Sequence, residues 1–133
     1  MNTIVIDHVG IAVNSIDESL EFWEAALGVS RADVETVEAP KVRTASFQIK
    51  DSEVELLEAT TPDSPVAKFI EKRGEGIHHI AIRVDDLEKA LSEMENRGMK
   101  LIDEPPRKGA RGALIAFIHP KAAGGVMLEL SQL

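Results

Sequence analysis

The chain has 133 residues, of which 44% are hydrophobic, 29% are charged and none is cysteine. This length and apolar content suffice for one compact domain or two tightly fused half-domains, and the lack of cysteine excludes disulfides and thiol catalysis. The formal net charge of −8 argues against general nucleic-acid binding, and the lack of a long apolar run or signal-peptide pattern predicts a cytoplasmic protein that is not embedded in a membrane.

The first half of the chain predicts several strands and one long helix. Short runs of β-prone and alternating residues predict strands near 3–13, 41–49 and 53–59, with a weaker strand at 31–38. A helix is expected from Ile16 to Leu27, because Ser15-Ile16-Asp17-Glu18 matches a capping box. Gly28 ends it. Its apolar stripe, which we expect in the core, is formed by Ile16, Leu20, Trp23 and Leu27.

The second half repeats this design after a short connecting helix. Ser64 and Pro65 suit the N-cap and first position of that helix. A further helix is expected from about Leu87 to Arg97, with a stop at Gly98. Strands are expected near 77–84, 112–118 and 125–131.

An internal repeat relates the two halves. The strand at 6–13 returns 71 positions later at 77–84, with His8 aligned to His79, and each copy runs into a helix. Each is also followed by an apolar strand that carries an acidic residue, Glu55 in the first half and Glu129 in the second. The repeat predicts two modules, 1–59 and 76–133, joined by the connecting helix at 60–75.

Two histidines and two glutamates are therefore candidates for one metal site. His8, Glu55, His79 and Glu129 all fall on faces opposite the aliphatic side chains of their strands. Any one of them alone reads more simply as a packed or solvated side chain, but together they suit Zn, Mn, Fe, Co or Ni. Without cysteine ligands, an open catalytic site is favoured over a closed structural one.

The repeat, the four ligand positions and the segments 7–12, 55–58, 76–81 and 118–121 resemble the vicinal oxygen chelate superfamily and, within it, the methylmalonyl-CoA epimerase family. The resemblance implies an α+β fold in which two paired βαβββ modules form a concave mixed sheet around a metal site, as a single domain over 1–133. It implies a divalent ion (Co, Mn, Ni, Zn or Mg) held by His8, Glu55, His79 and Glu129, and a homodimer.

The activity that the resemblance implies is the interconversion of (R)- and (S)-methylmalonyl-CoA in propionate metabolism, by metal-assisted removal of the α-proton through an enolate. Several such epimerases carry a glutamate after a Val-Arg pair, but here Val42-Arg43 precedes Thr44. A threonine hydroxyl is a poor general base, so Glu129 becomes the candidate base. Its partner is left open among a water on the metal, a carboxylate at 35–38 and Lys41.

An acyl-CoA substrate also needs a site for its phosphates. The basic residues Arg107, Lys108 and Arg111 lie in a stretch that contains Gly109 and Gly112, and Lys121 follows the next strand. The alternative is an ordinary solvated loop. His119, before Pro120, is either a substrate contact or a packed turn residue.

Other members of the superfamily are alternatives to an epimerase. Glyoxalase I can present the same ligand set, but the segments 104–106 and 118–121 look more like the epimerase. A non-enzymatic member that binds a small molecule usually lacks a complete ligand set. Dioxygenases of the superfamily normally keep two histidines and one glutamate, so the additional Glu55 counts against them.

Overall fold

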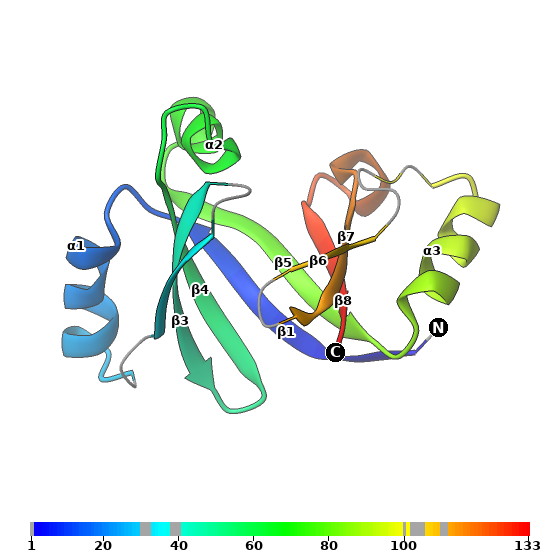
Figure 1. Cartoon of the computed structure of the whole chain (residues 1–133), viewed down its shortest axis with the longest axis horizontal. Coiled ribbons are helices and arrows are strands. Elements are labelled where there is room, and N and C mark those ends of the chain that lie inside the picture. Colours follow the sequence, from blue (N-terminus) through cyan, green and yellow to red (C-terminus); the bar gives the residue numbers. More distant parts are fainter. Residues whose placement is uncertain (1, 30–32, 38–40, 100, 102–105, 110–111) are drawn as a thin grey trace. The chain divides into compact units, whose positions relative to one another are not determined.

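The computed structural model describes residues 2–29, 33–37, 41–99, 101, 106–109 and 112–133. It divides into two compact units: unit 1 contains the residues up to Asp7 together with His79–Leu133, and unit 2 contains His8–His78. Two neighbouring strands, β1 (Thr3–Ala12) and β5 (Gly76–Val84), each contribute residues to both units (Figure 1). The chain therefore passes from one unit to the other at His8 and again at His79.

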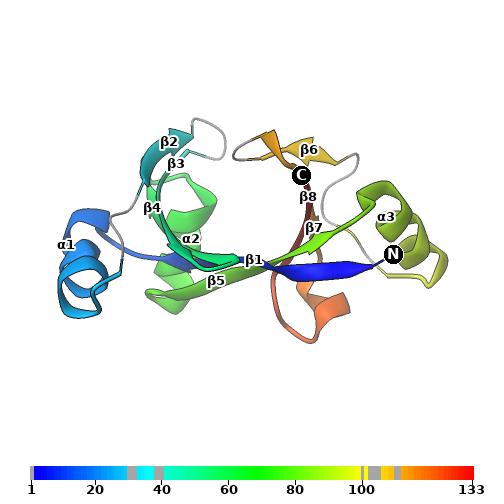
Figure 2. The ribbon, with the colours of Figure 1, turned by 90° about the horizontal axis from the view of Figure 1, so that it is seen from below.

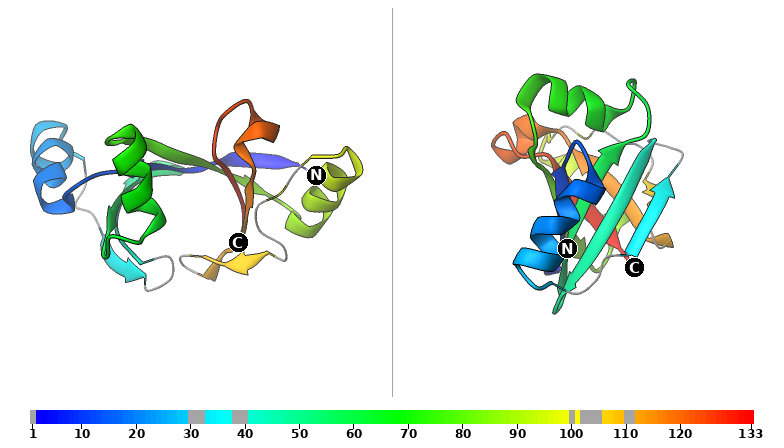
Figure 3. Two further views of the ribbon diagram at one scale, coloured as in Figure 1. Left: turned by 90° about the horizontal axis from the view of Figure 1, so that it is seen from above. Right: turned by 90° about the vertical axis from the view of Figure 1, so that its left-hand side faces the viewer.

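In unit 2 the strands follow the order β2-β3-β4-β1-β5. Three of them are antiparallel neighbours, β2 (Asp33–Val37), β3 (Val42–Ile49) and β4 (Ser52–Ala59), whereas β1 is parallel to β4. Two helical segments cover opposite faces of these strands (Figure 3), α1 (Ile16–Leu20) with its continuation η1 (Glu21–Ala26), and α2 (Pro65–Arg73). The first packs on Phe47 and Leu56 and the second on Val42 and Leu57.

In unit 1 the strands follow the order β1-β5-β8-β7-β6. β8 (Leu128–Gln132) is parallel to β5, and β7 (Leu114–Ile118) and β6 (Arg107–Lys108) continue the sheet antiparallel. α3 (Leu87–Asn96) packs its apolar stripe against β7 and β8, and a 3-10 turn, η3 (Pro120–Ala123), follows β7. Figure 2 shows the start of β1 close to α3, where Asn2 donates hydrogen bonds to Asp85. The expected α+β fold with a mixed sheet is confirmed.

Each unit fixes its helix to its acidic strand by an equivalent contact. Glu58 accepts a hydrogen bond from the backbone N–H of Ile16, the first residue of α1, at 2.6 Å. Gln132 accepts one from the N–H of Leu87, the first residue of α3, at 2.7 Å. Because these acceptors lie three residues after Glu55 and Glu129, each strand that carries a candidate ligand is held to a helix terminus.

The expected helix from Ile16 to Leu27 is wrong in its second half. The α-helix ends at Leu20 and continues as a π-helix, which has a wider turn. Trp23 then stacks on Phe47 with ring centroids 5.9 Å apart. The changed period moves Leu27 off the apolar stripe, and 54% of this residue is exposed.

Two expected strands also begin too early. β8 begins at Leu128 rather than 125, because Gly124 and Gly125 have φ angles of 66° and 89° and form a turn after η3. β7 begins at Leu114 rather than 112, since Gly112 also has a positive φ of 72°. None of the helices in the described part of the chain is long and apolar enough to cross a membrane.

Candidate metal and substrate site

Unit 2 brings His8 and Glu55 together on one face of its sheet. In the parallel register of β1 and β4, Glu55 lies opposite Gly10, two residues after His8. The His8 Nε2 atom is 3.9 Å from Glu55 Oε1, and the two side chains are only 8% and 12% exposed. The predicted pairing of these residues is therefore present within unit 2.

Unit 1 contains the equivalent pair. In the parallel register of β5 and β8, Glu129 lies opposite Ala81, two residues after His79. His79 Nε2 is 3.5 Å from Glu129 Oε1, with side chains 5% and 7% exposed. The histidine, the small residue and the glutamate hold the same relative positions as in unit 2, so the repeat in the sequence is a repeat of one half-site.

Each pair fits a divalent metal ion. The distances between the histidine nitrogen and the glutamate oxygen are longer than in strong hydrogen bonds. They suit two ligand atoms that would each lie about 2.0–2.2 Å from a shared metal ion. Imidazole and carboxylate are also a suitable donor set for such ions. One imidazole nitrogen and one carboxylate oxygen from each unit are therefore available as ligands.

The histidine that precedes His79 has a different role. His78 points to the other side of β5, where its ring meets the edge of Phe69 with centroids 4.9 Å apart. Burial lowers the pKa of His78 below its usual value, so its neutral form is favoured. Of the two adjacent histidines, His79 is the one suited to bind a metal.

Thr44 is buried on β3, in the strand register opposite Leu57 and on the face that carries Glu55. Its hydroxyl donates a long hydrogen bond of 3.4 Å to the backbone oxygen of Glu35. Lys41, another candidate for proton transfer, forms an exposed ion pair of 2.7 Å with Asp63. Glu38, at the end of the 35–38 segment, lies outside the described residues.

The predicted basic residues are not all brought together. Arg107 and Lys108 form β6, beside the start of β7, whereas His119 and Lys121 follow the end of β7. His119 Nδ1 accepts a hydrogen bond from the N–H of Lys121, which gives this histidine a structural role. Arg111 lies outside the described residues.

Gly109 has a packing role beside its proposed ligand contact. A Cβ atom at this position would lie 2.9 Å from a side-chain atom of Ile115. Close packing of β6 on β7 is therefore a sufficient reason for this glycine.

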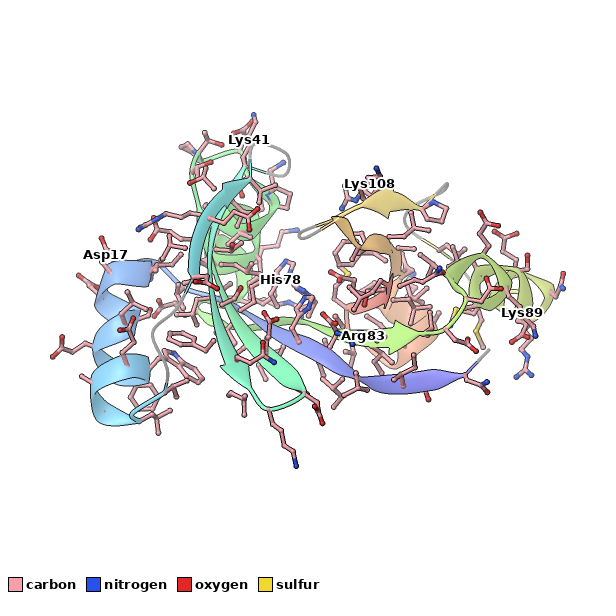
Figure 4. The ribbon with its side chains drawn as sticks, turned by 60° about the horizontal axis from the view of Figure 1, so that its bottom comes forward. Asp17, Lys41, His78, Arg83, Lys89 and Lys108 are labelled. Carbon is pink, nitrogen blue, oxygen red and sulfur yellow. The ribbon has the colours of Figure 1, made fainter. Side chains whose placement is uncertain are left out.

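The sequence patterns did not identify three side chains near the two pairs. Glu53 lies opposite His8 in the β1–β4 register and shares a face with Glu55, which the alternation in Glu53-Val54-Glu55 indicates. Arg83 of β5, labelled in Figure 4, donates hydrogen bonds to Asp7, the neighbour of His8. No sequence signal distinguished this partly buried pair from surface charges.

The third of these is Phe117, whose ring meets His79 edge-on with centroids 5.8 Å apart. In sequence it belongs to an apolar strand and reads as an ordinary core residue.

Comparisons with known proteins identify the family. The profile of the Glyoxalase/Bleomycin resistance protein/Dioxygenase superfamily matches residues 7–117. The uncharacterized protein YqjC of Bacillus subtilis is 45% identical over 127 residues, 96% of this chain and 91% of YqjC. The mitochondrial methylmalonyl-CoA epimerase of Homo sapiens is 31% identical over 128 residues, 96% of this chain and 73% of that protein.

A solved structure agrees with these relatives. The Streptomyces coelicolor methylmalonyl-CoA epimerase in complex with 2-nitronate-propionyl-CoA superposes with a TM-score of 0.93 at 36% identity, over 98% of each chain. The chain has methylmalonyl-CoA epimerases among its homologues and belongs to the Glyoxalase/Bleomycin resistance protein/Dioxygenase superfamily.

Proposed function

We propose that this protein is a methylmalonyl-CoA epimerase. The observation that carries the proposal is the pair of equivalent, buried His–Glu half-sites, His8 with Glu55 and His79 with Glu129, in a chain whose homologues include enzymes of that name. The reaction requires an acidified carbon and a base; these side chains would hold the metal ion that acidifies the carbon and would supply the base.

We further propose that the two pairs bind one divalent ion. His8 and His79 hold equivalent positions in their units, each two residues before the strand position that lies opposite its glutamate. Four such ligands would hold the ion and leave room on it for the substrate. When bound, the ion would supply the positive charge that stabilises negative charge on the thioester and carboxylate oxygens of the substrate.

In this proposal Glu129 is the general base. Its carboxylate takes the proton from the carbon between the thioester and the carboxylate, the C–H electron pair moves toward the thioester oxygen, and an enolate forms. Burial of Glu129 and His79 limits access of water to the reacting carbon. Return of a proton to the opposite face of the enolate completes the epimerisation.

Protonation of the opposite face of the enolate needs a group other than Glu129. Thr44 is a poor proton donor because an unactivated hydroxyl is a weak acid. Three described carboxylates share the sheet face of Glu55, namely Glu53 on β4 and both Asp33 and Glu35 on β2. We propose that one of these returns the proton. Thr44→Ala is then expected to leave proton exchange largely intact.

Deuterium exchange tests the proposed activity. Metal-loaded protein incubated with methylmalonyl-CoA in deuterated water should introduce deuterium at the α-carbon, measured by mass spectrometry. Glu129→Gln, assayed with metal restored, should reduce exchange to the uncatalysed rate, whereas Thr44→Ala should not. A parallel reaction with methylglyoxal and glutathione is the control. Formation of lactoylglutathione without α-deuteration would assign the protein to glyoxalase I instead.

A further inference from the structure

A row of side chains in unit 1 runs from a cation to the His79–Glu129 pair. Phe117 on β7 lies opposite Glu129 on β8. Arg107 on β6 lies opposite Ile115, two residues before Phe117. Because alternate side chains of a strand share a face, Arg107, Phe117 and Glu129 lie on the face that also carries His79. Figure 4 locates β6 by Lys108, the sequence neighbour of Arg107.

Phe117 contacts the members of this row on both sides. Its ring meets His79 nearly at right angles, with an interplanar angle of 83°. The guanidinium carbon of Arg107 lies 5.6 Å from the centroid of the Phe117 ring, within the range of a cation–π contact. The half-buried phenylalanine therefore joins an exposed arginine to a buried metal-ligand candidate.

The contact with the Phe117 ring restricts the orientation of the Arg107 guanidinium. A guanidinium that lies over an aromatic ring is held in a fixed orientation, and its N–H edges match the oxygens of a carboxylate or a phosphate. Without the ring, the long arginine side chain would lose conformational freedom when it bound such a group, which weakens binding.

We infer that Phe117 is a positioning residue, which holds Arg107 beside the His79–Glu129 pair so that the guanidinium binds an anionic oxygen group of the substrate. The inference rests on the proposed function for the identity of the substrate. The anionic group is either the carboxylate of the acyl part or a phosphate of CoA, which share this chemistry.

The test uses two ligands that each carry one of the two groups. Propionyl-CoA has the phosphates but no free carboxylate, and methylmalonyl-pantetheine has the carboxylate but no phosphate. Dissociation constants for metal-loaded wild type, Phe117→Leu and Arg107→Gln are measured by isothermal titration calorimetry. Binding does not depend on turnover, so a wild type that binds these ligands but does not epimerise methylmalonyl-CoA would refute the proposed function and leave this inference testable.

Phe117→Leu and Arg107→Gln are expected to raise the dissociation constant of the same ligand by about tenfold. Phe117→Trp keeps an aromatic ring at this position and should bind that ligand as the wild type does. Weaker binding of propionyl-CoA alone identifies a phosphate, and weaker binding of methylmalonyl-pantetheine identifies the carboxylate. Phe117→Leu should have little additional effect in an Arg107→Gln background, because the two residues act as one unit. With methylmalonyl-CoA as substrate, KM should rise while kcat changes little.

Unit 2 offers a matched control. Phe69 of α2 also lies beneath an arginine, Arg73 at 5.9 Å, and against a histidine, His78 at 4.9 Å. Phe69→Leu should leave both dissociation constants unchanged. The inference is overturned if Phe117→Leu and Arg107→Gln leave both within twofold of wild type, or if Phe69→Leu weakens binding equally. Should Phe117→Leu fail to fold, unchanged binding in Arg107→Gln alone overturns it.

Discussion

Ser64 and Ser131 are both almost fully buried, at 0% and 2% exposure, but their hydroxyl groups differ. Ser64 caps α2 by accepting a hydrogen bond from the N–H of Val66. The Ser131 hydroxyl has no hydrogen-bond partner among the described residues. It lies on β8 two residues after Glu129, on the same face of the sheet.

We expect opposite effects when the two hydroxyls are removed. Ser64→Ala should lower the free energy of unfolding by about 1 kcal/mol, because it removes a helix cap. Ser131→Ala should leave it unchanged or raise it by up to about 1 kcal/mol, since a buried unsatisfied hydroxyl destabilises the fold. Urea unfolding of the two variants measures this difference. Equal destabilisation by both would mean that Ser131 has a partner, such as buried water, in solution.

The sheet face of the half-site residues could be predicted from the sequence, because strand alternation decides which side chains leave the aliphatic face. His8 and Glu55 lie opposite the core side chains Ile11 and Leu56, as expected. The role of Ala12 was less evident from the sequence, where a small residue suggests room for a ligand. In the structure Ala12 packs in a buried cluster with Val66 of α2. Phe117 could not be assigned, because no local pattern shows that an aromatic strand residue contacts His79.

Among the elements, the start of β3 is tied to the segment before α2 by an exposed ion pair, Lys41 with Asp63. Hydrogen bonds from Lys41 and Thr61 lower the pKa of Asp63 from 3.8 to about 2. A carboxyl group whose pKa is lowered by folding stabilises the fold above its unfolded pKa. This stabilisation is lost as the pH falls from about 4 toward 2.

Lys41→Met should therefore lower the melting temperature modestly near pH 6, and its difference from wild type should shrink below about pH 4. Lys50→Met is the control, because Lys41 and Lys50 have similar positive φ angles of 62° and 54°. Lys50 lies on the exposed β3–β4 turn and forms no ion pair among the described residues. Thermal unfolding between pH 2 and 7 checks this, and a difference that stays constant across that range would contradict it.

The element boundaries that the sequence missed have local causes. Hydrophobic periodicity cannot distinguish an α-helix from one that changes to a π-helix, and the stacking of Trp23 on Phe47 involves a strand far along the chain. The start of β8 depends on the positive φ angles of Gly124 and Gly125, which the apolar run after them obscured.

At the scale of the whole molecule, the repeat predicted the paired half-sites but not the compact units. His8 and Glu55 are 47 positions apart and His79 and Glu129 are 50, yet both glutamates lie opposite the residue two after their histidine. The compact units instead divide β1 and β5 at the histidines, so the first strand contributes to both. Such sharing depends on strand pairing between distant segments. The homodimer stays a prediction, which sedimentation equilibrium tests.

In the proposed enzyme, both half-sites bind one ion on which proton exchange depends. The most direct measurement is the rate of α-deuteration of methylmalonyl-CoA as metal is added to chelator-treated protein. We expect the rate to rise from background and reach its plateau at about one ion per chain. His8→Ala and His79→Ala should each lose bound metal and exchange while remaining folded, whereas His119→Ala should still bind one ion. A plateau at two ions per chain, or full metal and full exchange in either of the first two variants, would contradict the claim.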